Sequence, residues 1–212
     1  MVISYLGAQS FKIQFGDTVV AYNPVSKDSK LKSTSFGSDI VLISTNHEDF
    51  NGKENAARGE KAPFIISLPG EYEIKGVFIK GFPSKTKYGG TEKNNTIYMM
   101  SLEGINLCFL GALSSKELPS EISEGLQEVD ILFVPIGGEG VLAPSDAYKL
   151  SVEIEPKIII PMHYGNIGSA NALKTFLKEG GEDSGATEDK LTIKKKDLEG
   201  KEGDIVVLKP IV

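Results

Sequence analysis

The sequence is poor in the residues that disulfides, membrane spans and metal sites need. It contains one cysteine, no tryptophan and two histidines. A single cysteine excludes an internal disulfide, and Cys108 lies in an apolar run where it is most simply a small core residue. No stretch approaches the roughly 18 consecutive apolar residues of a membrane span, and the N-terminus lacks the charged and apolar regions of a signal peptide. We therefore expect a cytoplasmic protein with no membrane partner.

Positive charge is also in short supply. The 212 residues carry 29 acidic and 23 basic side chains, a net charge of −6. This balance does not provide the broad basic surface that nucleic acids need, so no nucleic-acid partner is expected. The one basic run, Lys194–Lys196, is followed by Asp197 and Glu199 and is typical of a solvated strand end. With 40% hydrophobic residues, the chain is long and apolar enough to form one domain over residues 1–212.

The first half of the chain has the patterns of strands. Apolar Phe11, Ile13 and Phe15 alternate with polar residues, which predicts a half-buried strand, and residues 19–22 follow a turn as its hairpin partner. Short apolar runs predict further strands at residues 39–43, 64–66, 77–79, 96–100 and 106–110. Residues 82–94, between the runs at 77–79 and 96–100, are expected to form a loop.

The second half alternates helices with strands. Helices are predicted near residues 119–125, from Pro144 to Ile154, and after Ser169, which can cap a helix whose inner face includes Phe176. Strands are predicted at residues 130–135, 157–161, 191–193 and 205–208, with a loop at 180–189. Many strands followed by alternating helices and strands indicate an α/β protein in which two sheets pack together with helices outside.

Both histidines follow a buried apolar strand. Sites in α/β sheets form at the carboxyl ends of strands, and Asp49 lies two residues after His47. His47, Asp49 and His163 could therefore hold one divalent ion, zinc or manganese, with water completing its shell. The alternative is that both histidines are ordinary hydrogen-bonded loop residues, because a His-x-Asp pair with a distant histidine is a weak signal by itself.

Longer segments along nearly the whole chain form a series that is more specific than any one motif. The segments are Ser4–Ile13, Pro69–Glu73 with Gly76-Val77, Asn95–Tyr98 with Glu103-Gly104, Val129–Gly138 and, most distinctive, Pro156–Tyr164. In this order they resemble the metallo-β-lactamase-fold hydrolases, most closely the branch that includes the ascorbate-6-phosphate lactonase-like proteins. The resemblance implies a four-layer αββα sandwich with the site in a cleft at the shared edge of the two sheets.

The chain departs from the family pattern at the site that the resemblance implies. Where the family has Thr-His-x-His-x-Asp-His, residues 44–50 read Ser-Thr-Asn-His-Glu-Asp-Phe, so Thr45 and Phe50 replace two histidines. Of the expected ligands, only His47 carries over for one metal position, and Asp49 and His163 for the other. The remaining family positions are occupied by Lys85, Thr86 or Phe109 for a histidine, Ala112 for the bridging aspartate and Asn23 for an aspartate before a proline.

Phenylalanine cannot coordinate a metal and alanine cannot bridge two ions, whose mutual repulsion requires a bridge and several ligands each. We therefore expect a degenerate metal site, no resident cofactor, and a binding or structural role without hydrolysis. The alternative is a metal-dependent hydrolase of a small phosphorylated or lactone-type substrate, with one divalent ion held weakly by His47, Asp49 and His163. A scaffold that assembles into a homo-oligomer is a third hypothesis, and a small molecule in the cleft is the expected partner.

Chemistry without metal would need an activated nucleophile or an acid–base pair. His47 or His163 could serve as the base, and four hydroxyl residues are expected near the cleft: Ser44, Thr45, Ser84 and Thr86. Tyr164 and Glu71 either line the cleft or are structural. Residues 137–140, Gly-Gly-Glu-Gly, follow a strand as phosphate loops do but lack the lysine and spacing of one, so a plain strand-to-helix connection is the simpler interpretation.

Overall fold

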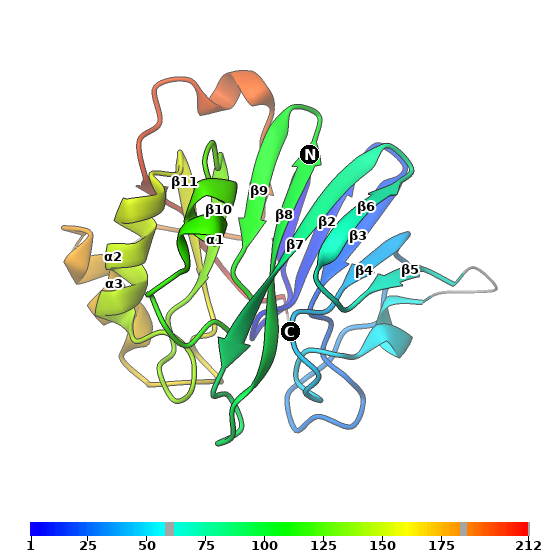
Figure 1. Ribbon diagram of the computed structural model, residues 1–212, viewed down its shortest axis with the longest axis horizontal. Helices are drawn as coiled ribbons and strands as arrows, with labels where there is room; N and C mark the ends of the chain where they lie inside the picture. The colour runs from blue at the N-terminus through cyan, green and yellow to red at the C-terminus, as the bar shows by residue number, and fades with distance from the viewer. Residues whose placement is uncertain (58–61, 183–185, 212) are drawn as a thin grey trace.

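The computed structural model describes residues 1–57, 62–182 and 186–211, which form two mixed β-sheets packed face to face (Figure 1). Six described strands form the first sheet, antiparallel from β13 to β3 and parallel from β3 to β5. In spatial order they are β13 Leu191–Thr192, β1 Val2–Tyr5, β2 Phe11–Phe15, β3 Thr18–Tyr22, β4 Ile40–Leu42 and β5 Phe64–Ile66.

Seven described strands form the second sheet, parallel from β14 to β9 and antiparallel from β9 to β6. In spatial order they are β14 Asp204–Ile205, β11 Ile158–Met162, β10 Ile131–Pro135, β9 Ile105–Phe109, β8 Lys93–Leu102, β7 Val77–Thr86 and β6 Gly70–Ile74. The fully buried runs of β10 and β11 are covered on both faces, which explains why they lack the alternation of a half-exposed strand.

The main core lies between the two sheets and is rich in aromatic rings. Tyr22 of β3 stacks on Phe109 of β9 with ring centroids 4.4 Å apart, and Phe11 of β2 meets Phe133 of β10 edge-on at 4.8 Å. These rings are fully buried, and such pairs add roughly 0.5–1.5 kcal/mol each beyond the burial of their area. The sandwich is therefore held together by the inward faces of both sheets.

Helices cover the outer face of the second sheet. They are α1 Ser120–Gly125, α2 Pro144–Ile154 and α3 Ala172–Glu179, and Figure 1 shows them beside β10 and β11. The outer face of the first sheet is covered instead by the loop before β4 and the short 3-10 helix η1 Lys53–Ala56, through Phe36 and Ala56. The α/β sandwich expected from the sequence is confirmed, and in the described residues its fourth layer is a loop with one helical turn.

The predicted elements are mostly in place, and three local predictions are wrong. The predicted loop at residues 82–94 is too long, because β7 runs to Thr86 and β8 starts at Lys93, which leaves residues 87–92 as the turn of one long hairpin. Ser169 does not cap α3, which begins after Asn171 without a side-chain cap. Of the predicted loop 180–189, residues 183–185 lie outside the described residues, and Thr187–Glu188 form strand β12, which pairs with β15 Val207–Leu208. No described helix is long and apolar enough to span a membrane.

Candidate functional site

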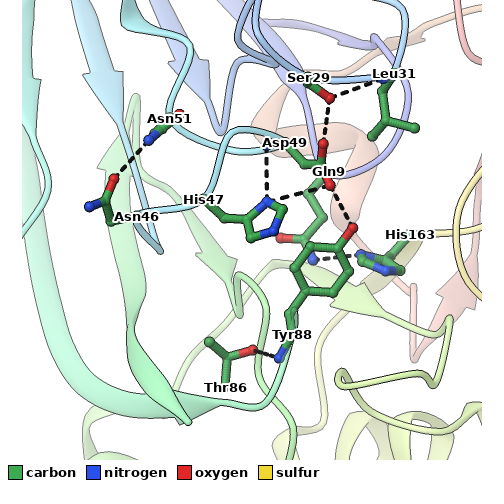
Figure 2. A network of polar contacts seen from close by, with 10 residues as sticks. All are labelled: Gln9, Ser29, Leu31, Asn46, His47, Asp49, Asn51, Thr86, Tyr88 and His163. Atoms are coloured by element: carbon green, nitrogen blue, oxygen red, sulfur yellow. Dashed lines mark hydrogen bonds and ion pairs between the residues drawn. The ribbon is translucent and has the colours of Figure 1, made fainter. Parts of the chain in front are cut away.

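The three predicted site residues lie in one cluster at the carboxyl ends of strands (Figure 2). His47 and Asp49 follow β4, and His163 follows β11 directly. His47 Nδ1 lies 3.5 Å from Asp49 Oδ2. His163 meets this pair through the ring of Tyr88, whose centroid is 4.8 Å from that of His47 and 5.2 Å from that of His163. The tip of the β7–β8 hairpin therefore supplies the side chain that joins the two histidines.

Each side-chain oxygen of Asp49 accepts a hydrogen bond from a neutral hydroxyl. The Ser29 hydroxyl donates to its Oδ1, and the Tyr88 hydroxyl donates to its Oδ2 at 2.6 Å. Burial and the hydrogen bond to Asp49 raise the pKa of Tyr88, so this hydroxyl stays protonated and remains a donor. The Asp49 side chain is only 12% exposed. Both of its oxygens thus bind hydroxyl protons in the position where a metal ligand was expected.

His47 uses one ring nitrogen within its own turn. The backbone N–H of Asp49 donates to His47 Nδ1 at 3.2 Å, which leaves Nε2 as the ring nitrogen available to other groups. That nitrogen faces the hairpin tip, where a Cβ added at Gly89 would lie 3.3 Å from His47 Nε2 and 3.2 Å from Lys93 Nζ. The left-handed backbone of Gly89, with φ of 80°, lets the tip approach the ring closely.

His163 is fully buried and held in a strained backbone. Its φ is 63°, and its backbone N–H donates to the Ala8 carbonyl at 2.6 Å. Gln9 Nε2 lies 2.8 Å from its Nδ1, whereas its Nε2 has no hydrogen-bond partner among the described residues. Burial lowers the pKa of His163 to about 3, and the Asp49 carboxylate acts in the opposite direction. The ring is therefore neutral at physiological pH.

A second layer of buried amides supports His163. Asn23 donates from Nδ2 to Gln9 Oε1 at 3.0 Å and to Ser44 Oγ at 2.8 Å, and the Ser44 backbone N–H donates to Asn23 Oδ1 at 2.8 Å. Asn23 stands where the resemblance implies an aspartate. Its backbone is also left-handed, with φ of 39°, a conformation that asparagine tolerates better than most residues. Gln9 and Tyr88 were missed by the sequence analysis, because nothing local distinguishes them from ordinary loop residues.

The replaced family positions divide into two groups. Phe50 and Ala112 are fully buried in an apolar cluster at the site, together with Ala8, Val25, Val141 and Ile167. Thr45 lies beside them and donates to Asn95 Oδ1 at 3.1 Å. Phe109, in contrast, is not at the site, since it belongs to the core between the sheets. The prediction of a lost ligand at Phe109 is therefore wrong, whereas Phe50 and Ala112 do line the region where metal was expected.

Other residues considered from the sequence are engaged elsewhere. The Ser84 hydroxyl bonds to Asn95, and the Thr86 hydroxyl donates to the Gly140 carbonyl at 3.4 Å, so neither forms a pair with a described histidine. Tyr164 donates to the Leu208 carbonyl at 2.6 Å, which is a structural role. Glu71 is exposed on β6 and pairs with Lys80 at 3.0 Å, away from the cluster.

The described residues do not fit a metal centre as they are arranged. No group of three or more His, Cys, Asp or Glu side chains among them could hold an ion. The Asp49 oxygens already accept hydrogen bonds from Ser29 and Tyr88, and Nδ1 of each histidine faces a donor group. An ion would have to compete with these donors and with the Tyr88 ring, which lies between the two imidazoles.

The chain is similar to a family model, to named proteins and to a solved structure. Residues 2–163 match the family model of the beta-lactamase superfamily domain. A UPF0173 metal-dependent hydrolase of Natranaerobius thermophilus is 22% identical over 77% of this chain and 83% of its own length, and one of Listeria innocua is 27% identical over 77% and 85%. The structure of a metallo-beta-lactamase superfamily protein from Thermotoga maritima superposes with a TM-score of 0.76, at 26% identity, over 98% of this chain and 97% of that chain.

Proposed function

Because the chain belongs to the beta-lactamase superfamily, we propose that it is a member that has lost the paired-metal centre and acts by binding instead of by metal-dependent hydrolysis. The support comes from Tyr88, whose hydroxyl donates to Asp49 and whose ring contacts both histidines. One side chain thereby donates a hydrogen bond to the carboxylate and places its ring between the two imidazoles. An ion at this place would have to displace a half-buried ring and break its hydrogen bond.

The apolar neighbours of Tyr88 point the same way. Phe50 packs against it with ring centroids 4.9 Å apart and reaches to within 6.0 Å of the His163 ring. Ala112, in the same apolar cluster, offers no carboxylate. Two doubly charged ions in this setting would be held by few ligands and little water, and their repulsion would not be offset. We infer that a group bound at this cluster is neutral or apolar.

The names of the relatives favour a second candidate. Proteins 22% and 27% identical to this chain are called metal-dependent hydrolases. In this alternative, a single zinc or manganese ion would be held by His47, Asp49 and His163, and a small phosphorylated or lactone-type molecule would be the substrate. Such an ion would compete with the hydroxyls of Ser29 and Tyr88, each of which donates to one oxygen of Asp49.

Metal analysis of the purified full-length protein separates the two candidates. The protein is incubated with zinc or manganese, passed over a desalting column and assayed by inductively coupled plasma mass spectrometry. We expect far less than one ion per chain, and two ions per chain would overturn the proposal. One ion per chain that is lost in Asp49→Asn would favour the mononuclear alternative, whereas one ion that is unaffected by this change would be bound elsewhere.

Restoring the missing ligands tests the proposal from the other direction. The triple variant Thr45→His, Phe50→His, Ala112→Asp is expected to gain bound metal in the same assay, because it returns two imidazoles and a carboxylate to the cluster. Its matched control is Phe50→Leu, which loosens the apolar packing without adding a ligand and should remain free of metal. A folded triple variant that binds no metal would mean that these positions do not correspond to the family's ligand positions.

A further inference from the structure

We propose that a chain of buried amide hydrogen bonds fixes the tautomer of His163, so that its ring offers an N–H group, and not a lone pair, to the cluster around Tyr88. Gln9 and Asn23 are the positioning residues of this chain, which Figure 2 shows in part. The inference deepens the proposed function, because it concerns a side chain of the same cluster. It can nevertheless be tested without any measurement of metal.

The first hydrogen bond of this series has a donor that is not in doubt. A backbone N–H can only donate, and that of Ser44 lies 2.8 Å from Asn23 Oδ1, which identifies this atom as the amide oxygen. The Asn23 NH₂ group then faces Ser44 Oγ at 2.8 Å and Gln9 at 3.0 Å. An amide nitrogen has no lone pair to accept with, so the Gln9 atom that it faces is Oε1.

The orientation of the Asn23 amide determines that of the Gln9 amide. Since Gln9 Oε1 receives the Asn23 donor, the Gln9 NH₂ group must face His163, and it lies 2.8 Å from Nδ1. Only an unprotonated Nδ1 can accept that bond, so the proton of the neutral ring resides on Nε2. The backbone N–H of Ser44, acting through Asn23 and Gln9, therefore decides which ring nitrogen of His163 carries the proton.

Reversal of the chain is blocked by burial. Turning the Gln9 amide over would oppose its NH₂ group to that of Asn23, and turning Asn23 as well would oppose an NH₂ group to the Ser44 N–H. Gln9, Asn23 and His163 are all fully buried, so water cannot relieve such a clash of donors. The position of the ring is fixed too, because the His163 backbone N–H donates to the Ala8 carbonyl.

The consequence concerns what His163 can do. Its Nε2–H has no acceptor among the described residues, and the ring stands edge-on to Tyr88 at an interplanar angle of 87°. Histidines that ligate a metal usually donate their other N–H to an acceptor; here the other nitrogen receives a bond. In this tautomer the nitrogen that is not bonded to Gln9 can be neither a metal ligand nor a general base.

Two histidines in the whole chain make the tautomer directly readable. Protein labelled with ¹⁵N-histidine, kept in chelator, is examined by long-range ¹H–¹⁵N correlation NMR, which distinguishes protonated from unprotonated ring nitrogens. His47→Gln leaves a single imidazole and assigns the signals. We expect His163 to be protonated at Nε2 and bare at Nδ1. A His163 ring protonated at Nδ1 in the unmodified protein would overturn the inference.

Reversing the amide chain should move the proton. In Asn23→Asp, a carboxylate that can only accept faces Gln9, so Gln9 turns its NH₂ group to it and presents Oε1 to His163, which must then carry its proton on Nδ1. Gln9→Glu should give the same spectrum without any change at Asn23, so either variant suffices if the other does not fold. Asn46→Asp makes the same chemical change at an exposed position and should leave His163 unchanged.

The outcomes separate this inference from the proposed function. Folded Asn23→Asp or Gln9→Glu with an unaltered His163 spectrum would overturn the inference, whatever the metal content. Metal bound by the unmodified protein, with the chelated form still protonated at Nε2, would overturn only the proposed function. A switch of tautomer in both variants, with Asn46→Asp unchanged, is the result that we expect.

Discussion

The three parallel strands β9, β10 and β11 end in buried polar networks of opposite character. At their amino end, Asp130 accepts hydrogen bonds from Lys157 Nζ at 2.6 Å, from Lys195 Nζ at 2.9 Å and from the Asn106 backbone N–H at 2.8 Å. Burial alone would raise the pKa of Asp130, but these three bonds outweigh it and hold the pKa below its usual value. This network consists of a buried carboxylate and two partly exposed lysines, and both oxygens of the carboxylate are hydrogen-bonded.

At the carboxyl end, the network around His163 is neutral and incomplete. It consists of amides and an uncharged imidazole, one ring N–H has no acceptor among the described residues, and Ala8, Asn23 and His163 all have positive φ. Strain and unmet bonding capacity concentrate at sites, whereas saturated ion pairs stabilise architecture. The two ends of this sheet therefore differ in how fully their polar groups are bonded: the end with the candidate site has the strained backbone and, among the described residues, the ring N–H without an acceptor.

The largest expected effect is a substitution at Gly137, which packs against His163 at the carboxyl end of the parallel strands. A Cβ added there would lie 2.4 Å from the His163 carbonyl oxygen and 2.4 Å from its Cδ2, so Gly137→Ala must shift the His163 segment. We expect the free energy of unfolding in urea to fall by about 3 kcal/mol. The adjacent Gly138→Ala meets nothing within 4 Å and only adopts a φ of 65°, which costs about 1 kcal/mol. Equal costs for the two variants would show that His163 yields easily.

Acid should weaken the carboxyl end before the amino end. The pKa of His163 is lowered to about 3 in the folded protein by burial, whereas an unfolded histidine titrates near 6.5. The unfolded chain thus binds the extra proton, so stability is full above pH 6.5 and falls by about 1.4 kcal/mol per pH unit on the way down to pH 3.

The measurement is urea unfolding at pH values from 7 to 4.5, and the control is His163→Asn, which keeps a residue tolerant of positive φ and should lose this slope. The pKa of Asp130 is also lowered in the folded protein, so its contribution is lost in the same direction: it is present above the unfolded pKa of 3.8 and disappears only as pH falls below that value. Parallel slopes for the unmodified protein and His163→Asn would contradict the assignment of the acid response to His163.

Neutralising the amino end should cost less than the steric change at Gly137. In Asp130→Asn, two lysines lose their charged acceptor, and we expect a loss of about 2 kcal/mol in the free energy of unfolding. The matched control is Asp204→Asn, because Asp204 pairs with Lys201 near the surface, where its side chain is 46% exposed, and exposed pairs contribute less than about 1 kcal/mol. If both variants cost the same, the Asp130 network is not the stabilising element proposed.

The smallest expected effect is at the hairpin tip. Tyr88→Phe keeps the ring contacts with both histidines but removes the hydrogen bond to Asp49, so the free energy of unfolding should fall by about 1 kcal/mol. The same variant leaves Asp49 Oδ2 without a hydroxyl donor and is expected to gain weak zinc affinity by calorimetry. If the variant is as stable as the unmodified protein and likewise binds no zinc, the hydrogen bond from Tyr88 to Asp49 is not what keeps metal away.

Local pattern predicted most of the fold and part of the site. The alternation at residues 11–15 and the apolar run at 158–162 indicate strands because burial acts on neighbours in sequence. The contact between Gln9 and His163 joins residues 154 apart, and Tyr88 reaches Asp49 only because β7 and β8 are longer than their apolar runs. Pairings of this kind depend on the register of distant strands, which no short pattern encodes.

Cys108 gives the molecule an internal reporter of opening. It lies in β9 between Leu132 of β10 and Met99 of β8, is fully inaccessible, and burial raises the pKa of its thiol. The side chain packs in the apolar cluster between the second sheet and the helices, so a thiol reagent can react only after the helices have moved away or the sheet has opened. The rate of labelling, followed across urea concentrations, would measure how often this cluster opens under native conditions without any engineered probe.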